Sequence, residues 1–297
     1  MPKLPRTRRD IGNLQTLQSL LFPSSPVDLV FVAIDFEAPD YIINRFQQGC
    51  LDTQVGLAIL DTRSLSATSK FTTFNFITRE DAYFEKSAPF YHWGTAEKTP
   101  VTSMLSKINN CLRVYQDRSI VLVGHGVFTE LRALKALGFD FQEHRVIAKL
   151  DTYLLAQDLQ LGHFRLRNLL VELECRCNIN FHNAGNDANY TLRALLLLAI
   201  KAIGAVESRE TAERVRIFWW IAVEEVSSRK WQKCMRRKAA KIWTLEEQEE
   251  IRVKRREYRE LYIVKDGLKE KRESEGVKYL DFGIHSFDFY WSQNFAI

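Results

Sequence analysis

The stretch Val27-Asp-Leu-Val-Phe-Val-Ala-Ile-Asp-Phe-Glu37 decides the fold of this chain. It is a nearly unbroken apolar run, rich in β-branched residues, and Ala38-Pro39 ends it. A run of this length and composition predicts a β-strand that is buried on both faces. Strands of this kind lie in the middle of sheets that carry helices on both sides. The sequence therefore predicts an α/β layered domain built around this strand.

The flanking sequence extends this layered pattern. Apolar runs predict further strands, and 3.6-residue spacing predicts helices between and after them. The strands are expected at 53–61, 70–78, 119–124 and 145–150, and the helices near 100–115, 127–137, 152–160, 164–174 and 187–203. Strands that first form a meander and then alternate with helices are typical of a mixed sheet. We expect a mixed five-stranded sheet flanked by helices over residues 27–205, with an N-terminal extension at 1–26 and a helical, basic C-terminal extension at 206–297.

Composition excludes several classes of protein. The chain has 297 residues, of which 46% are hydrophobic, with 13 Gly and 7 Pro. This is too apolar for a disordered chain and long enough to bury a core without disulfides. Five scattered cysteines and the lack of an apolar leader argue for a reducing compartment, and no apolar run reaches the roughly 20 residues of a membrane span. We therefore expect an intracellular protein, nuclear or cytoplasmic, with no membrane partner.

Two acids end the first strand. Asp35 and Glu37 are separated by one residue, so their side chains point to the same face of the sheet. Two adjacent carboxylates repel each other and are costly to bury alone, whereas a divalent cation such as Mg²⁺ prefers carboxylate oxygens. The alternative is that both acids reach solvent where the strand leaves the core.

Two later segments carry further polar side chains. In Gly124–Glu130, Glu130 falls in the early turns of a helix, where the dipole favours a carboxylate, although exposed helical acids are ordinary. In His182-Asn-Ala-Gly-Asn-Asp187, a loop histidine precedes a carboxylate in the first turn of a helix. That spacing can set an imidazole beside a metal held by Asp187, as a base for water. The alternative is a helix cap with a surface histidine.

Taken in order, these three patterns resemble the DEDDh exonucleases, the DnaQ-like branch of the ribonuclease H-like superfamily. Gln54–Thr62 looks like that family's second strand and Leu150-Asp151-Thr152 like the strand before its third motif, so the resemblance covers roughly residues 28–203. With Tyr91-His-Trp-Gly94, the chain is most similar to a fungal subgroup. That subgroup includes an mRNA-export-linked factor and an Argonaute-interacting exonuclease of the quelling pathway.

The resemblance implies a function and a set of site residues. Asp35, Glu37, Glu130 and Asp187 would hold two Mg²⁺ or Mn²⁺ ions, His182 would be the general base, and His125 would contact nucleic acid. The expected reaction is 3′→5′ hydrolysis of phosphodiester bonds at single-stranded RNA or DNA ends. One departure stands out, since the family's second motif usually has Asp where this chain has Glu130. Normal activity with a shifted backbone, a preference for Mn²⁺, and a site that binds but cuts poorly all stay open.

The positive charge is concentrated near the C-terminus. Residues 229–272 hold 16 Lys and Arg against 8 Asp and Glu, a net charge of +8, which leaves −3 on the rest of a chain whose total is +5. Cations with interleaved tryptophans can bind phosphates and stack on bases. The candidates are Arg229, Lys230, Trp231, Lys233, Arg236, Arg237, Lys238 and Lys241. Alternatively, this helix packs on the body, or the chain is a non-catalytic nucleic-acid-binding or scaffold protein of the same fold.

Overall fold

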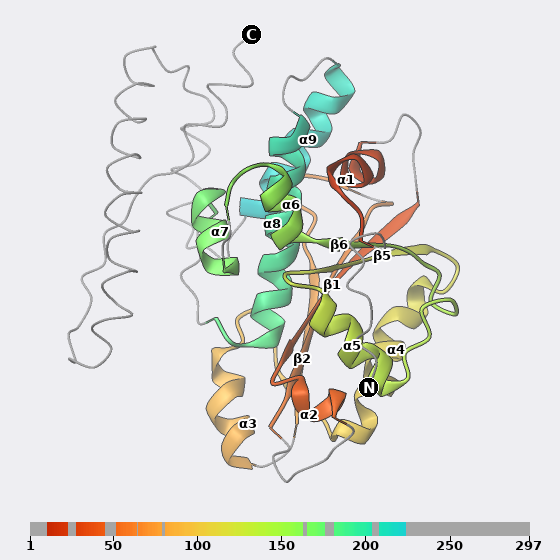
Figure 1. Cartoon of the computed structure of the whole chain (residues 1–297), viewed down its shortest axis with the longest axis vertical. Helices are drawn as coiled ribbons and strands as arrows, with labels where there is room; N and C mark the ends of the chain where they lie inside the picture. The colour runs from red at the N-terminus through yellow and green to blue at the C-terminus, as the bar shows by residue number, and fades with distance from the viewer. Residues whose placement is uncertain are drawn as a thin grey trace, which may run out of the picture. The chain divides into compact units, whose positions relative to one another are not determined.

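The computed structural model describes residues 11–22, 28–44, 52–63, 65–78, 81–162, 165–175, 181–203 and 208–223. The chain divides into two compact units, Met1–Glu224 and Glu225–Ile297. All the described residues belong to the first unit (Figure 1). The basic residues expected to bind nucleic acid, from Arg229 to Lys241, lie outside the described residues.

A six-stranded mixed sheet forms the centre of the first unit. Its strand order is β4-β3-β2-β1-β5-β6. The strands are β1 (Leu29–Glu37), β2 (Gln54–Asp61), β3 (Thr72–Ile77), β4 (Glu97–Lys98), β5 (Ser119–Gly124) and β6 (Val146–Asp151). β1 pairs antiparallel with β2 and parallel with β5, and β5 pairs parallel with β6. The predicted mixed α/β sheet is confirmed, with one strand more than expected, because the two residues of β4 are too few to show a hydrophobic period.

Helices cover both faces of this sheet. They are α1 (Leu14–Leu21), α2 (Asp40–Ile43), α3 (Asp81–Ser87), α4 (Val101–Leu112), α5 (Phe128–Leu137), α6 (Thr152–Asp158), α7 (Leu166–Glu172), α8 (Ala184–Ile203) and α9 (Arg209–Val223), with short 3-10 turns at Ala88–Phe90 and Arg113–Tyr115. Val30, Val32, Ile34 and Phe36 of β1 share a hydrophobic cluster with buried residues of α4 and α5. Side chains alternate along a strand, so the odd-numbered residues of β1, Asp35 and Glu37 among them, face the other layer, which contains α8.

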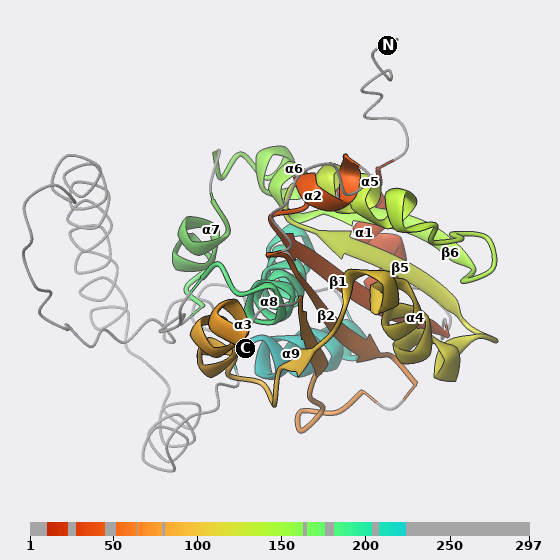
Figure 2. The ribbon, with the colours of Figure 1, turned by 90° about the horizontal axis from the view of Figure 1, so that it is seen from below.

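Helix α8 is the central helix of that second layer. It contacts β1, β2 and β3 on one side and α1, α6, α7 and α9 on its others (Figure 2). Seventeen of its residues, from Ala184 to Ile200, are buried, as expected for a helix that is packed all round. It begins three residues before the predicted start at 187, because Asn183 caps it: the Asn183 Oδ1 atom accepts a hydrogen bond from the N–H of Asn186 at 3.3 Å.

Helix α9 packs against α8. The guanidinium of Arg193 in α8 donates to the carbonyl of Ala222 at 2.6 Å and lies 4.7 Å from the centre of the Trp93 ring. A cation at the last carbonyls of a helix is favoured by the helix dipole. Residues 209–223, which were expected in the C-terminal extension, therefore pack as part of the first unit. None of the described helices combines the length and apolar character needed to cross a bilayer.

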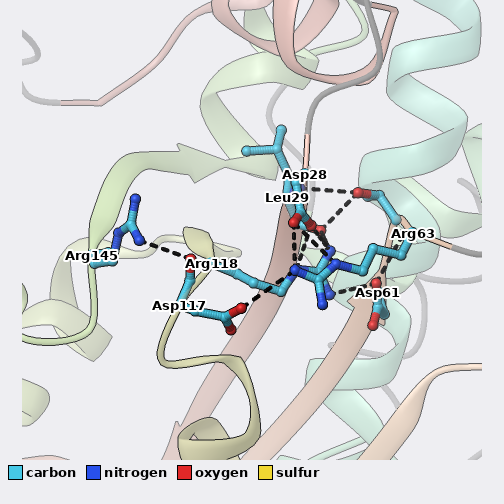
Figure 3. A network of polar contacts seen from close by, with 8 residues as sticks. Asp28, Leu29, Asp61, Arg63, Asp117, Arg118 and Arg145 are labelled. Carbon is cyan, nitrogen blue, oxygen red and sulfur yellow. Dashed lines mark hydrogen bonds and ion pairs between the residues drawn. The ribbon is translucent and has the colours of Figure 1, made fainter.

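An ion-pair network joins three strands at the amino end of β1 (Figure 3). Arg118, at the start of β5, is 2% exposed and donates to the carbonyl of Leu29 at 2.9 Å. Its guanidinium also pairs with Asp28 and, at 2.6 Å, with Asp61. Exposed Arg63 binds the same Asp28 at 2.6 Å. The network thus joins the start of β1, the end of β2 and the start of β5, and leaves the carboxyl end of β1 free for a site.

Candidate active site

The carboxylates of β1 lie at its carboxyl end. Asp35 and Glu37 are partly exposed while Phe36 between them is buried in the opposite layer, so the strand alternation predicted from the sequence is confirmed. Both acids therefore face α8. This arrangement needs no special backbone, because it follows from the two-residue period of the strand.

Asp187 approaches the same place from α8. It lies in the first turn of that helix and is 7% exposed. Asp35, Glu37 and Asp187 each offer a carboxylate oxygen within 4.8 Å of the other two. We call these three residues the carboxylate cluster. Strand β1 and helix α8 are about 150 residues apart in the chain, so this cluster exists only in the folded protein.

Two glycines allow the start of α8 to pack closely against its neighbours, one against the backbone of β2 and one against the Tyr91 ring. Gly56 of β2 lies opposite Asp35 in the strand pairing, and a Cβ atom at Gly56 would stand 1.9 Å from the carbonyl oxygen of Ala184. A Cβ at Gly185 would stand 2.6 Å from the Tyr91 ring. Only a residue without a side chain fits either contact. Gly56 therefore fixes how close Asp187 lies to the acids of β1.

Side-chain amides hold the loop before α8. Asn183 accepts a hydrogen bond from the Asn75 amide at 3.1 Å and donates to the carbonyl of Ser87 at 3.3 Å. Asn186 accepts from the N–H of His92 at 3.1 Å and donates to the carbonyl of Phe90 at 2.7 Å. All these groups are uncharged, so the loop keeps its position whatever the protonation state of the acids. The sequence segment Tyr91–Gly94 indicated only a similarity to the fungal subgroup. In the structure, His92 of this segment helps to hold the loop before α8.

Burial perturbs the titration of all three acids in the cluster. Desolvation raises the pKa of Asp187 to about 8, although the N–H of His182 donates to its carboxylate at 2.9 Å. Desolvation, together with repulsion from Asp187, raises the pKa of Asp35 well above its usual range. Burial also raises the pKa of Glu37. The Oδ1 atom of Asp187 is buried and has no hydrogen-bond partner among the residues that the structure describes. Such a group of hard oxygens must hold either protons or cations.

Glu130 lies beside this cluster and not within it. The residue is in the first turn of α5 and 7% exposed, and burial raises the pKa of its carboxyl to about 8. Its charge raises the pKa of Asp35, which shows that the two carboxyls interact. The group of described residues able to hold a metal ion does not include Glu130, and its Oε2 atom is buried without a hydrogen-bond partner.

Asp151 positions the start of α5, a role that the sequence did not predict. Its carboxylate accepts hydrogen bonds from the N–H groups of Gly126 at 2.9 Å and Val127 at 3.1 Å. Beside it, the His125 ring is 2.9 Å from the Thr152 hydroxyl. The only signal in the sequence was the Leu150-Asp151-Thr152 likeness. His125, predicted to contact nucleic acid, is thus held at the same edge of the sheet as the carboxylate cluster.

His182 is anchored by its backbone. Its φ angle is 69°, in the left-handed region that is costly for a residue with a side chain. Its N–H is held by Asp187, but its imidazole is 91% exposed, with Nδ1 3.8 Å from the nearer oxygen of Glu37. The ring therefore stands at the open side of the cluster, free to meet a water molecule and a substrate.

Comparison with known proteins agrees with this arrangement. The profile of a family described as "DNA polymerase III subunit epsilon-like, C-terminal domain", of the DEDDh type, matches residues 30–198, which is more than half of the chain. No curated protein matches the chain. The likeness to the fungal subgroup stays a prediction. The matched range begins in β1 and ends in α8, so it spans Asp35, Glu37, Glu130, His182 and Asp187. The ribonuclease H-like sheet, the acids that it brings together and the family match show that the chain belongs to the DEDDh exonuclease family.

Proposed function

We propose that this protein is a metal-dependent 3′→5′ exonuclease that removes nucleotides from single-stranded RNA or DNA. The observation that carries the proposal is the carboxylate cluster, three acids with oxygens within 4.8 Å at the edge of the sheet, inside a chain of the DEDDh family. His182 lies beside this cluster. The proposal also keeps the expected location inside the cell, nuclear or cytoplasmic.

The cluster fits divalent cations. Its donors are carboxylate oxygens, which Mg²⁺ and Mn²⁺ prefer, and no described residue donates a hydrogen bond to the buried Oδ1 atom of Asp187. Asp35, Glu37 and Asp187 would hold two ions, with Glu130 contributing charge from beside them. When bound, the ions would stabilise negative charge on the scissile phosphate and lower the pKa of the attacking water. The raised pKa values mean that protons must leave the acids as the ions bind.

His182 would act as the general base. As the oxygen of a water molecule bonds to phosphorus, one water proton passes to a nitrogen of the exposed imidazole. The bond from phosphorus to the 3′ oxygen of the preceding nucleotide breaks, and that oxygen takes a proton from solvent. A nucleoside 5′-monophosphate and a strand shorter by one nucleotide result. An imidazole suits this role because its usual pKa lies near neutrality.

A non-catalytic, nucleic-acid-binding or scaffold role is the second candidate. The position of Glu130 favours it, since this residue replaces the family's aspartate and lies outside the carboxylate cluster. In this role the basic residues 229–272 would bind phosphates, and binding would survive Asp35→Ala. The two candidates share the fold and differ in whether the strand is cut.

Matched single-stranded RNA and DNA oligonucleotides test the main proposal. With Mg²⁺ or Mn²⁺, a 3′-labelled strand should release labelled mononucleotide, and a 5′-labelled strand should shorten stepwise. Asp187→Ala should abolish both, whereas Asp117→Ala, an exposed acid at the other end of the sheet, should retain them. If protein free of contaminating nucleases releases nothing with either metal, the exonuclease proposal fails.

A metal titration separates the two candidates. Mn²⁺ should raise the melting temperature of the wild type and not of Asp35→Ala, since an ion bound only by the folded state adds about 2.7 kcal/mol at 100 times its Kd. Glu130→Gln should weaken cleavage if Glu130 supports the ions. Salt-sensitive oligonucleotide binding without a Mn²⁺ response or cleavage would identify the second candidate as correct.

A further inference from the structure

Helix α5 presents one face to solvent that carries two cations and an aromatic ring. Phe128 is 42% exposed, and Arg132 and Lys135 are exposed as well. Their spacing of four and three residues sets them on one side of the helix. Glu130, Ala133 and Leu134 are buried on its other side. We call Phe128, Arg132 and Lys135 the α5 outer face.

The two cations of this face have no acidic partner among the described residues. Among the residues that the structure describes, no carboxylate lies within 4.0 Å of Arg132 or Lys135, whereas partly exposed Lys107 and exposed Arg216 each pair with an acid. The acid of α5 itself, Glu130, is buried on the opposite side. Within the described part of the chain, the α5 outer face therefore carries positive charge that no acid pairs with, on a body whose sequence outside 229–272 is net negative.

The α5 outer face begins at the edge of the sheet that carries the carboxylate cluster. β5 is parallel to β1, with Val123 opposite Ala33, and α5 starts four residues after β5 ends. The carboxyl ends of β1 and β5 thus meet at one edge, and Phe128 is the first residue of α5 there. From Phe128 to Lys135 the helix rises about 10 Å away from that edge.

We propose that the α5 outer face holds the single-stranded nucleic acid upstream of the 3′ end being cut. Arg132 and Lys135 bind successive phosphates, and the Phe128 ring stacks on an unpaired base. Charge complementarity selects this occupant, because unpaired cations beside an exposed aromatic ring are what a single strand requires. The inference rests on the proposed function, since it assigns the substrate's path to that same site.

The test uses the full-length chain with a matched pair of double variants. Arg132→Gln/Lys135→Gln removes the two cations of the α5 outer face. Lys70→Gln/Arg209→Gln removes one exposed lysine and one exposed arginine elsewhere, in the β2–β3 connection and at the start of α9. Each is assayed on a 20-nucleotide strand and on a dinucleoside monophosphate, whose only phosphate is the one that is cut and which therefore offers no upstream phosphate to Arg132 or Lys135.

For Arg132→Gln/Lys135→Gln, kcat/KM on the 20-nucleotide strand should fall by about tenfold. The slope of log(kcat/KM) against log[salt] should become shallower by about 1.4, since each single-strand phosphate contact contributes about 0.7. Phe128→Ala should lower kcat/KM on the 20-nucleotide strand by a similar factor, because the base loses its stacking partner. Cleavage of the dinucleoside monophosphate should be unchanged, and the Lys70→Gln/Arg209→Gln control should match the wild type on both substrates.

The outcomes separate this inference from the proposed function. If the wild type cuts both substrates, and Arg132→Gln/Lys135→Gln cuts the long strand as well as the control does, the inference is overturned while the proposed function stands. If the wild type cuts neither, the proposed function fails, and fluorescence anisotropy of the labelled strand in EDTA still decides the inference. Weaker binding by the α5 variant than by the control supports it. Equal binding overturns it.

Discussion

Replacing Gly56 with alanine should disable the site without touching any residue of the carboxylate cluster. The new Cβ would lie 1.9 Å from the carbonyl oxygen of Ala184, whereas a close carbon–oxygen contact is about 3.3 Å. The first turn of α8 must therefore move away from β2 by more than about 1 Å. Asp187 is in that turn, and Gly56 is paired with Asp35 across the strands. The separation that holds the three carboxylates within 4.8 Å increases accordingly.

The size of the effect follows from this displacement. A misplacement of about 1 Å can reduce kcat by about 100-fold. Forcing a methyl group into a packed contact costs about 1–3 kcal/mol of stability, which for a unit of this size lowers Tm by roughly 2–12 °C. The Mn²⁺-induced rise in melting temperature should shrink as well, because the ligands no longer converge.

Gly94→Ala is the matched control. Its Cβ would meet only the Tyr91 ring, at 3.5 Å or more, which is an ordinary contact. The measurements are kcat on a 3′-labelled strand and melting temperature with and without Mn²⁺. A Gly56→Ala protein with the activity and Mn²⁺ response of Gly94→Ala would refute the view that the backbone contact between β2 and α8 sets the geometry of the site.

Two further predictions concern stability. Arg118→Met leaves the Leu29 carbonyl and the acids of its network without their buried cation and should cost about 2–4 kcal/mol in urea unfolding. Arg63→Met removes an exposed ion pair that solvent screens and should cost much less, so equal losses for the two variants would contradict the structure. In EDTA, Asp187 and Glu130 keep protons up to a pKa of about 8 in the folded chain but lose them near pH 4 when unfolded. Their contribution is therefore complete below about pH 4 and is lost as pH rises to about 8, so Tm should fall by several degrees across this window. Asp187→Asn should flatten this pH dependence and Mn²⁺ should oppose it; a Tm that rises with pH in EDTA would show that these acids are ionised.

The sequence predicted what depends on local periodicity. The apolar run around β1, the common face of Asp35 and Glu37, and the helical position of Asp187 all follow from periods of 2 and 3.6 residues, and the structure has them. The class of fold follows from the same periods, because alternating strands and helices have few ways to bury their apolar faces.

The parts that the sequence did not predict depend on contacts between distant segments. The two-residue strand β4 exists only because β3 pairs with it. The amide contacts of Asn183 join segments about 100 residues apart, and no local pattern encodes them. Glu130 stays a predicted metal ligand, and the sequence did not predict that it would be buried on α5 beside the carboxylate cluster. How close a side chain lies to the cluster depends on how its helix packs on the sheet, and the spacing of residues in a motif does not specify that packing.

The backbone and the side chain of His182 have separate surroundings. Its backbone N–H carries the contact to Asp187, and its imidazole, almost entirely in solvent, contributes nothing to the core. A glycine there would keep the backbone hydrogen bond and would adopt the left-handed φ angle more readily than histidine does. One substitution can therefore remove the proposed base while leaving the fold and the carboxylate cluster unchanged. If the proposed function holds, His182→Gly should abolish cleavage and retain nucleic-acid binding, in a protein at least as stable as the wild type.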